Sequence, residues 1–187
     1  MKANMPRRDF LDHTAKMIAA TGAGCCAFSG NHAAAATAGK ATTDSYCGLY
    51  CGACPAQLKS IAATKSSDVK CLGCKSGKLG KFCSKCEVRK CAIQQGVESC
   101  ALCESYPCEK ISAFIAGPYR KPLYGLRKKN LESIAKDGLE KWKAQQKARW
   151  TCKKCNKRFG YADDKCPHCG AKVYTCEQEF KAYAKGA

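Results

Sequence analysis

Apolar side chains recur at helical spacing in only a few short stretches of the chain. Spacings of three and four residues predict short helices over residues 56–63, 88–95 and 109–116. Gly117-Pro118 follows the last of these and should end it. The pattern therefore predicts short helices joined by turns.

Residues 117–150 form a second, more regular helical segment in this pattern. Asn130 is a good N-cap for a helix over 131–136, and residues 137–140 have the residue types of a capping box. A longer helix should then run over 139–149. We expect this helical segment to pack on a neighbouring part of the chain and to bind no cofactor itself.

The stretch 47–108 has too few apolar side chains to build a core of its own. It holds eleven Val, Ile, Leu or Phe residues and eleven cysteines in 62 residues. Some cross-link must hold it together, and metal bound by thiolates supplies one. We therefore expect residues 46–116 (the cysteine module) to be a small irregular fold of short helices and cysteine knuckles, stapled by metal.

Cysteine accounts for 18 of the 187 residues, whereas histidine occurs three times. The cysteine spacing favours metal sites over disulfides, because a C-x-x-C turn points two sulfurs at one place. The scarcity of histidine disfavours acid–base or nucleophilic catalysis, so no catalytic residue is predicted. Six C-x-x-C pairs occur: Cys51/Cys54, Cys71/Cys74, Cys83/Cys86, Cys100/Cys103, Cys152/Cys155 and Cys166/Cys169.

The last two pairs form the strongest local motif. Cys152-x2-Cys155, ten residues and Cys166-Pro-His-Cys169-Gly170 match a zinc ribbon, in which two knuckles on β-hairpins supply four thiolates. We therefore predict a β zinc ribbon over residues 151–173, with 174–187 as a short tail or helix. His168 lies inside a knuckle and is not expected to be a ligand. Iron could occupy the same four thiolates.

The N-terminal residues 1–38 have the features of an export signal. Arg7-Arg8-x-Phe10-Leu11 resembles a twin-arginine signal and precedes an uncharged, Ala- and Gly-rich stretch. Such signals export proteins that are already folded, often with a metal cofactor. The sequence therefore predicts an exported, periplasmic or extracytoplasmic protein whose first partner is the twin-arginine export machinery.

The cysteine order also resembles that of a known family. Cys47-Gly-Leu-Tyr-Cys51-Gly-Ala-Cys54-Pro55 is similar to the opening of an uncharacterised prokaryotic family, the domain of unknown function 3795. The resemblance continues through Cys71-Leu-Gly-Cys74, Cys100-Ala-Leu-Cys103 and Tyr106-Pro107-Cys108-Glu109, and covers about residues 46–170. It implies a metal-binding cysteine module and no particular substrate.

The spacing makes fifteen cysteines candidate metal ligands, but it does not say which of them share an ion. The eleven in the cysteine module do not divide into sites of four, so a twelfth ligand such as Asp44 or Glu87 could complete three sites. The fifteen candidates are Cys47, Cys51, Cys54, Cys71, Cys74, Cys83, Cys86, Cys91, Cys100, Cys103, Cys108, Cys152, Cys155, Cys166 and Cys169.

Three functions fit this cysteine content. The first is a structural zinc protein, whose closed four-thiolate sites serve folding. The second is an iron–sulfur electron-transfer protein, because Cys47-x3-Cys51-x2-Cys54 has the spacing that holds a [4Fe–4S] cluster in radical S-adenosylmethionine enzymes. The chain is, however, too short for the barrel of those enzymes. The third is a copper buffer, which is disfavoured because Met1, Met5 and Met17 all lie in the leader.

The chain is strongly basic, with 33 Lys and Arg against 15 Asp and Glu and a net charge of +18. These cations are spread along the sequence apart from Arg127-Lys128-Lys129, and export would separate the protein from nucleic acid. We therefore expect an anionic surface or a protein as partner, not nucleic acid. No transmembrane span is predicted in the mature chain.

Overall fold

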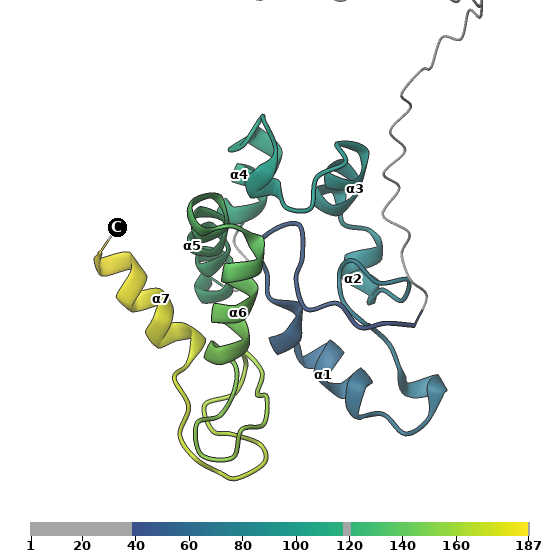
Figure 1. Cartoon of the computed structure of the whole chain (residues 1–187), viewed down its shortest axis with the longest axis vertical. Helices are drawn as coiled ribbons and strands as arrows, with labels where there is room; N and C mark the ends of the chain where they lie inside the picture. The colour runs from purple at the N-terminus through teal and green to yellow at the C-terminus, as the bar shows by residue number, and fades with distance from the viewer. Residues whose placement is uncertain (1–38, 118–120, 187) are drawn as a thin grey trace, which may run out of the picture. The chain divides into compact units, whose positions relative to one another are not determined.

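Helices dominate the regular structure of the computed structural model, which describes residues 39–117 and 121–186 (Figure 1). The predicted export signal over residues 1–38 lies outside the described residues. No helix in the described ranges combines the length and apolar character needed to cross a membrane. The helices are η1 (Cys51–Ala53), α1 (Pro55–Ala62), η2 (Ser66–Asp68), α2 (Lys81–Ser84), α3 (Glu87–Gln94), η3 (Cys100–Leu102), α4 (Glu109–Ala116), α5 (Lys121–Asp137), α6 (Leu139–Arg149) and α7 (Cys176–Lys185), with η denoting a 3-10 helix.

The helices expected from apolar spacing are confirmed. α1, α3, α4 and α6 begin and end within one residue of the predicted ranges, and Gly117 caps the end of α4. For residues 174–187 the sequence predicted either a short tail or a helix, and the structure has the helix α7. It begins with a capping box between Thr175 and Gln178, in which each side chain bonds the other residue's backbone.

Two predicted helix caps are wrong. α5 begins at Lys121, so Asn130 lies inside a helix and does not cap one. Its buried side chain is used elsewhere, because its Nδ2 donates to the carbonyl of Gly48 at 2.8 Å. The expected capping box over 137–140 is absent too, since Gly138 is the N-cap of α6 and the Asp137 carboxylate accepts from Lys141.

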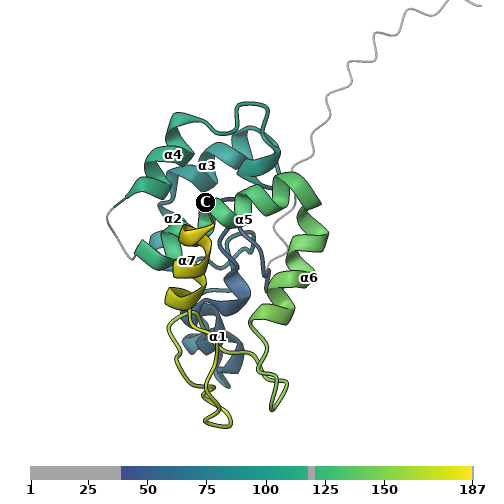
Figure 2. The ribbon, with the colours of Figure 1, turned by 90° about the vertical axis from the view of Figure 1, so that its left-hand side faces the viewer.

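The apolar core lies where α5 packs against its neighbours. Figures 1 and 2 show α7 running beside α5, and α6 lies against α5 as well. Trp142 of α6 is completely buried and meets the ring of Tyr50 edge-on, with centroids 6.1 Å apart. Gly125 of α5 leaves room for the ring of Phe180 of α7, which any larger side chain at that position would overlap. α5 therefore joins the cysteine module to the C-terminal helix.

A chain of buried hydrogen bonds crosses this core. Nε1 of Trp150 donates to Oε1 of Gln146 at 3.1 Å, and Nε2 of Gln146 donates to Oδ1 of Asn130 at 3.4 Å. Asn130 then reaches the Gly48 carbonyl, next to the first cysteine of the module. These bonds satisfy polar groups that burial would otherwise penalise.

The predicted β zinc ribbon is wrong in its secondary structure. Residues 151–173 (the knuckle segment) contain no strand, and within the described ranges only the isolated bridges Thr151–Arg158 and Lys165–Lys172 are present. The physical reason is competition for the backbone. Beyond the first bridge the N–H of Tyr161 donates to the Ala53 carbonyl of the cysteine module, so it does not continue the pairing within the segment.

Candidate metal centre

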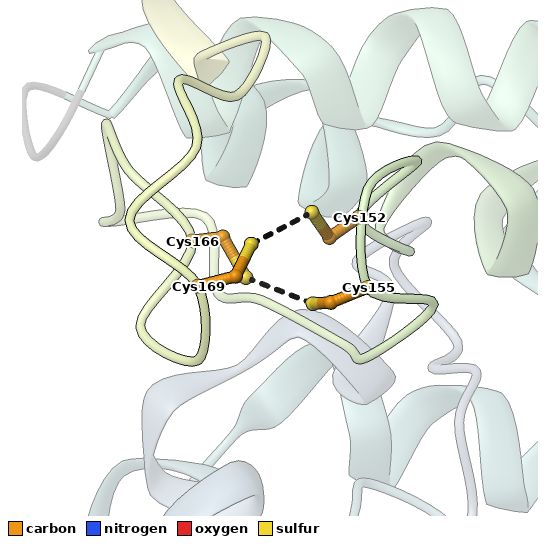
Figure 3. Close-up of side chains that lie close together, drawn as sticks. All are labelled: Cys152, Cys155, Cys166 and Cys169. Atoms are coloured by element: carbon orange, nitrogen blue, oxygen red, sulfur yellow. Dashed lines mark hydrogen bonds between the residues drawn. The ribbon is translucent and has the colours of Figure 1, made fainter.

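The four cysteines of the knuckle segment bring their sulfurs together, as Figure 3 shows. All four Sγ atoms lie within 4.8 Å of one another. The Sγ atoms of Cys152 and Cys169 are 3.7 Å apart, and those of Cys155 and Cys166 are 3.6 Å apart. A zinc ion with four Zn–S bonds of about 2.3 Å requires sulfurs about 3.8 Å apart. The group could therefore hold a metal ion with little movement.

Both knuckles use the same backbone scheme, displaced by 14 residues. In the first, Cys152 N–H donates to the Lys157 carbonyl and Asn156 N–H donates to the Cys152 carbonyl, at 2.9 and 2.8 Å. In the second, Cys166 N–H donates to Ala171 at 2.8 Å and Gly170 N–H donates to Cys166 at 2.9 Å. The knuckle segment is thus a structural repeat of two turns, each closed by one bridge.

The residue after each second cysteine lets the chain turn. Asn156 has φ +56° and Gly170 has φ +70°, a left-handed conformation that asparagine and glycine adopt most readily. In the first turn, the backbone N–H groups of Cys155 and Lys154 donate to Cys152 and lower the pKa of that thiol to about 7. Such donors stabilise the thiolate, which is the form that binds metal.

Aromatic packing holds the knuckle segment against the helices. Trp150 contacts Phe159 and Tyr161, with ring centroids 5.5 and 6.4 Å away. The guanidinium of Arg149 lies 4.1 Å from the Trp150 ring centroid, and its Nε donates to the buried Glu179 at 2.7 Å. Cys152 and Cys166 are buried in the same apolar cluster as Trp142, so the candidate metal group adjoins the main core.

One side chain of the knuckle segment reaches the cysteine module directly. The hydroxyl of Tyr161 donates to the Sγ of Cys54 at 3.2 Å. Sequence reasoning missed this contact, because 107 residues separate the partners and no local motif marks it. The Asn156 and Gly170 positions, by contrast, could have been found from their place after each C-x-x-C pair.

The eleven cysteines of the module are arranged less closely. Within residues 39–117 and 121–186, the knuckle cysteines are the one group of three or more potential ligands gathered within 4.8 Å. None of the eleven forms a disulfide. Cys47, Cys51, Cys71 and Cys74 are buried, whereas Cys54, Cys83, Cys86, Cys91, Cys100, Cys103 and Cys108 are half-buried.

Burial raises the pKa of several module thiols. Burial and then the charge of Cys47 raise the pKa of Cys74 and of Cys100 to about 12 each. Burial and then Cys71 raise that of Cys83 to about 11, and the pKa of Cys51 lies well above its usual value because of burial and then Cys74. These thiols hold their protons at neutral pH, so a metal ion that binds them must displace protons.

The carboxylates considered as extra ligands are engaged with lysines. Asp44 is buried and pairs with Lys75 at 2.5 Å. Glu87 is exposed and pairs with Lys90 at 2.8 Å, an interaction that lowers its pKa. His168 is exposed and lies outside the four-sulfur group.

The cysteine module is similar to a known family of proteins. Residues 43–113 match the family described as a protein of unknown function (DUF3795). The match supports the resemblance seen in the cysteine order, but it ends before α5 and the knuckle segment. No curated protein and no solved structure matches the chain. The family description names no substrate.

Proposed function

We propose that this is a metal-binding protein in which Cys152, Cys155, Cys166 and Cys169 hold one structural zinc ion. The observation that carries the proposal is the spacing of the four sulfurs, with contacts of 3.6 and 3.7 Å that fit a tetrahedral thiolate site. Four protein ligands leave no coordination position for a substrate, which favours a structural over a catalytic ion.

Its place in the fold supports a structural role. The knuckle segment has two bridges in place of strands, and its buried sulfurs adjoin the core around Trp142. An ion shared by the two turns would cross-link Cys152–Cys155 to Cys166–Cys169 where the backbone provides little pairing. For the cellular compartment, the proposal of export rests on the sequence of residues 1–38.

The test is metal content per chain in the purified full-length protein. Zinc and iron should be measured by mass spectrometry in the wild type, in Cys155→Ser and in Cys169→Ser, all prepared under reducing conditions. Each variant should lose one equivalent of zinc, because three thiolates hold the ion much less tightly than four. The matched control is Cys176→Ala, which removes a buried cysteine outside the group and should retain all metal.

Two results would contradict the proposal. If Cys155→Ser kept the full metal content of the wild type, the four cysteines would not share an ion. If the equivalent lost were iron, the site would stand but zinc would be the wrong metal. Iron bound by four thiolates is coloured, so an absorption spectrum separates that case from zinc.

A further inference from the structure

A pocket of about 700 Å³ in the cysteine module is lined by five cysteines. They come from separate parts of the chain: Cys47 precedes η1, Cys51 begins η1, Cys74 lies in the loop between η2 and α2, Cys83 lies on α2 and Cys86 caps α3. Local spacing pairs Cys83 with Cys86 and Cys47 with Cys51, but nothing in the local sequence brings all five together. Their common pocket is a consequence of how the module folds. The five sulfurs face it without being gathered within 4.8 Å as those of the knuckle segment are, so an ion bound here would draw them together.

Two of the five sulfurs have polar neighbours within hydrogen-bonding distance. None of the five is in a disulfide. The backbone N–H of Cys74 donates to the Sγ of Cys51 at 3.4 Å, and the Oγ of Ser45 lies 3.4 Å from the Sγ of Cys47. A hydrogen bond to sulfur stabilises its charged form. Cys47, Cys51 and Cys74 are buried, while Cys83 and Cys86 are half-buried.

The charges around the same pocket are mostly positive. Lys81, Lys85, Lys110 and Arg127 line it, against the single carboxylate of Glu87. Four or more thiolates around one divalent ion carry a net negative charge, which nearby cations offset. Apolar side chains such as Leu49 and Val88 complete the wall of the pocket.

We propose that Cys47, Cys51, Cys74, Cys83 and Cys86 form a second thiolate metal centre, independent of the knuckle segment. Four thiolates suffice for a zinc ion or for an iron–sulfur cluster, so the pocket has one sulfur more than either needs. In either case cysteine sulfur holds the metal, which is a zinc ion in the first case and iron with sulfide in the second. The half-buried Cys83 and Cys86 place one side of this centre toward solvent.

The spare sulfur decides which variant tests the proposal. A single Cys→Ser change leaves four cysteines, which could still bind, whereas the double variant Cys83→Ser/Cys86→Ser leaves three. Both residues are half-buried, so the change avoids the buried base of the pocket. Zinc, iron and acid-labile sulfide should be measured per chain after anaerobic purification, in the wild type, the double variant and Cys155→Ser.

We expect the double variant to lose at least one metal ion per chain while keeping the one that Cys155→Ser loses. Loss of zinc from a colourless protein identifies a zinc site. Loss of iron and sulfide in equal amounts, with a brown colour bleached by dithionite, identifies a cluster. Either result supports the second centre. Metal content in the double variant equal to that of the wild type would overturn it. Because each centre has its own variant, failure of one proposal leaves the other testable.

A second measurement covers the case in which the double variant does not fold. Native wild-type protein should be treated with iodoacetamide before and after chelation, and alkylation located by peptide mass spectrometry. Metal at this centre should protect Cys83 and Cys86 until it is removed. Rapid alkylation of both before chelation would show that no metal holds them, because both side chains are partly accessible.

Discussion

The knuckle segment and the cysteine module differ in how they bring sulfurs together. In the knuckle segment two copies of one turn, 14 residues apart, place four Sγ atoms within 4.8 Å. In the module the cysteines that face one pocket span residues 47 to 86 and come from η1, α2, the start of α3 and the loops between them. Local backbone geometry thus determines the first arrangement, and the fold of the whole module determines the second.

Removal of metal should have the largest effect, and it should be strongest in the knuckle segment. A structural zinc contributes about 10 kcal/mol or more to folding, and this segment has only two bridges to replace it. Chelation under reducing conditions should therefore abolish amide protection in residues 151–173. Hydrogen exchange read by mass spectrometry checks this, with α6 as the internal reference because its core side chains need no metal. Unchanged protection of the knuckle amides would contradict the prediction.

Removal of a large side chain from the core shared by the two regions should have the next largest effect. Trp142 is fully buried and contacts Tyr50 of the module within the cluster that includes Cys152 and Cys166. Trp142→Ala should lower the free energy of unfolding by about 3–5 kcal/mol, as for other buried tryptophans. Chemical denaturation followed by circular dichroism measures it. The control is Lys147→Ala on the exposed face of α6, expected to change stability by less than about 0.5 kcal/mol.

The smallest expected effect concerns one side-chain contact between the two regions. Tyr161→Phe removes the hydroxyl that donates to the Cys54 sulfur and leaves the ring against Trp150. The free energy of unfolding should fall by about 1 kcal/mol, the usual net value of one hydrogen bond. The matched control is Tyr183→Phe, which removes an exposed hydroxyl bond to Glu132. A loss no greater than that of Tyr183→Phe would show that the contact adds nothing of its own.

The sequence predicted those features that depend on neighbouring residues. The helices of α1, α3, α4 and α6 follow from apolar spacing, and the knuckle cysteines follow from two C-x-x-C pairs. The strands of the ribbon were wrongly predicted because a C-x-x-C pair determines only its own turn, and in the structure each turn is closed by a single isolated bridge. The pocket of five cysteines could not be predicted, since it depends on contacts across the module.

Asn130 shows why the remaining errors arose. Its side chain favours helix starts in isolated sequence, because it can accept a bond from the first free N–H groups. In the folded chain its side-chain amide donates to the Gly48 carbonyl, 82 residues away. The helix α5 continues through Asn130. A tertiary contact of this kind overrides local preference and leaves no mark in a short window of sequence.

Three buried hydrogen bonds also fix the alignment of the two cysteine regions. They run from Trp150 to Gln146, from Gln146 to Asn130 and from Asn130 to Gly48. Apolar contacts between α5 and α6 are non-directional and would tolerate sliding. The amide groups would not, because a shift of one helical turn, about 5.4 Å, leaves buried donors without acceptors. Two helices joined in this way have one permitted register. A shift of α6 along α5 therefore breaks the bond between Gln146 and Asn130, and a shift of the module along α5 breaks the bond between Asn130 and Gly48.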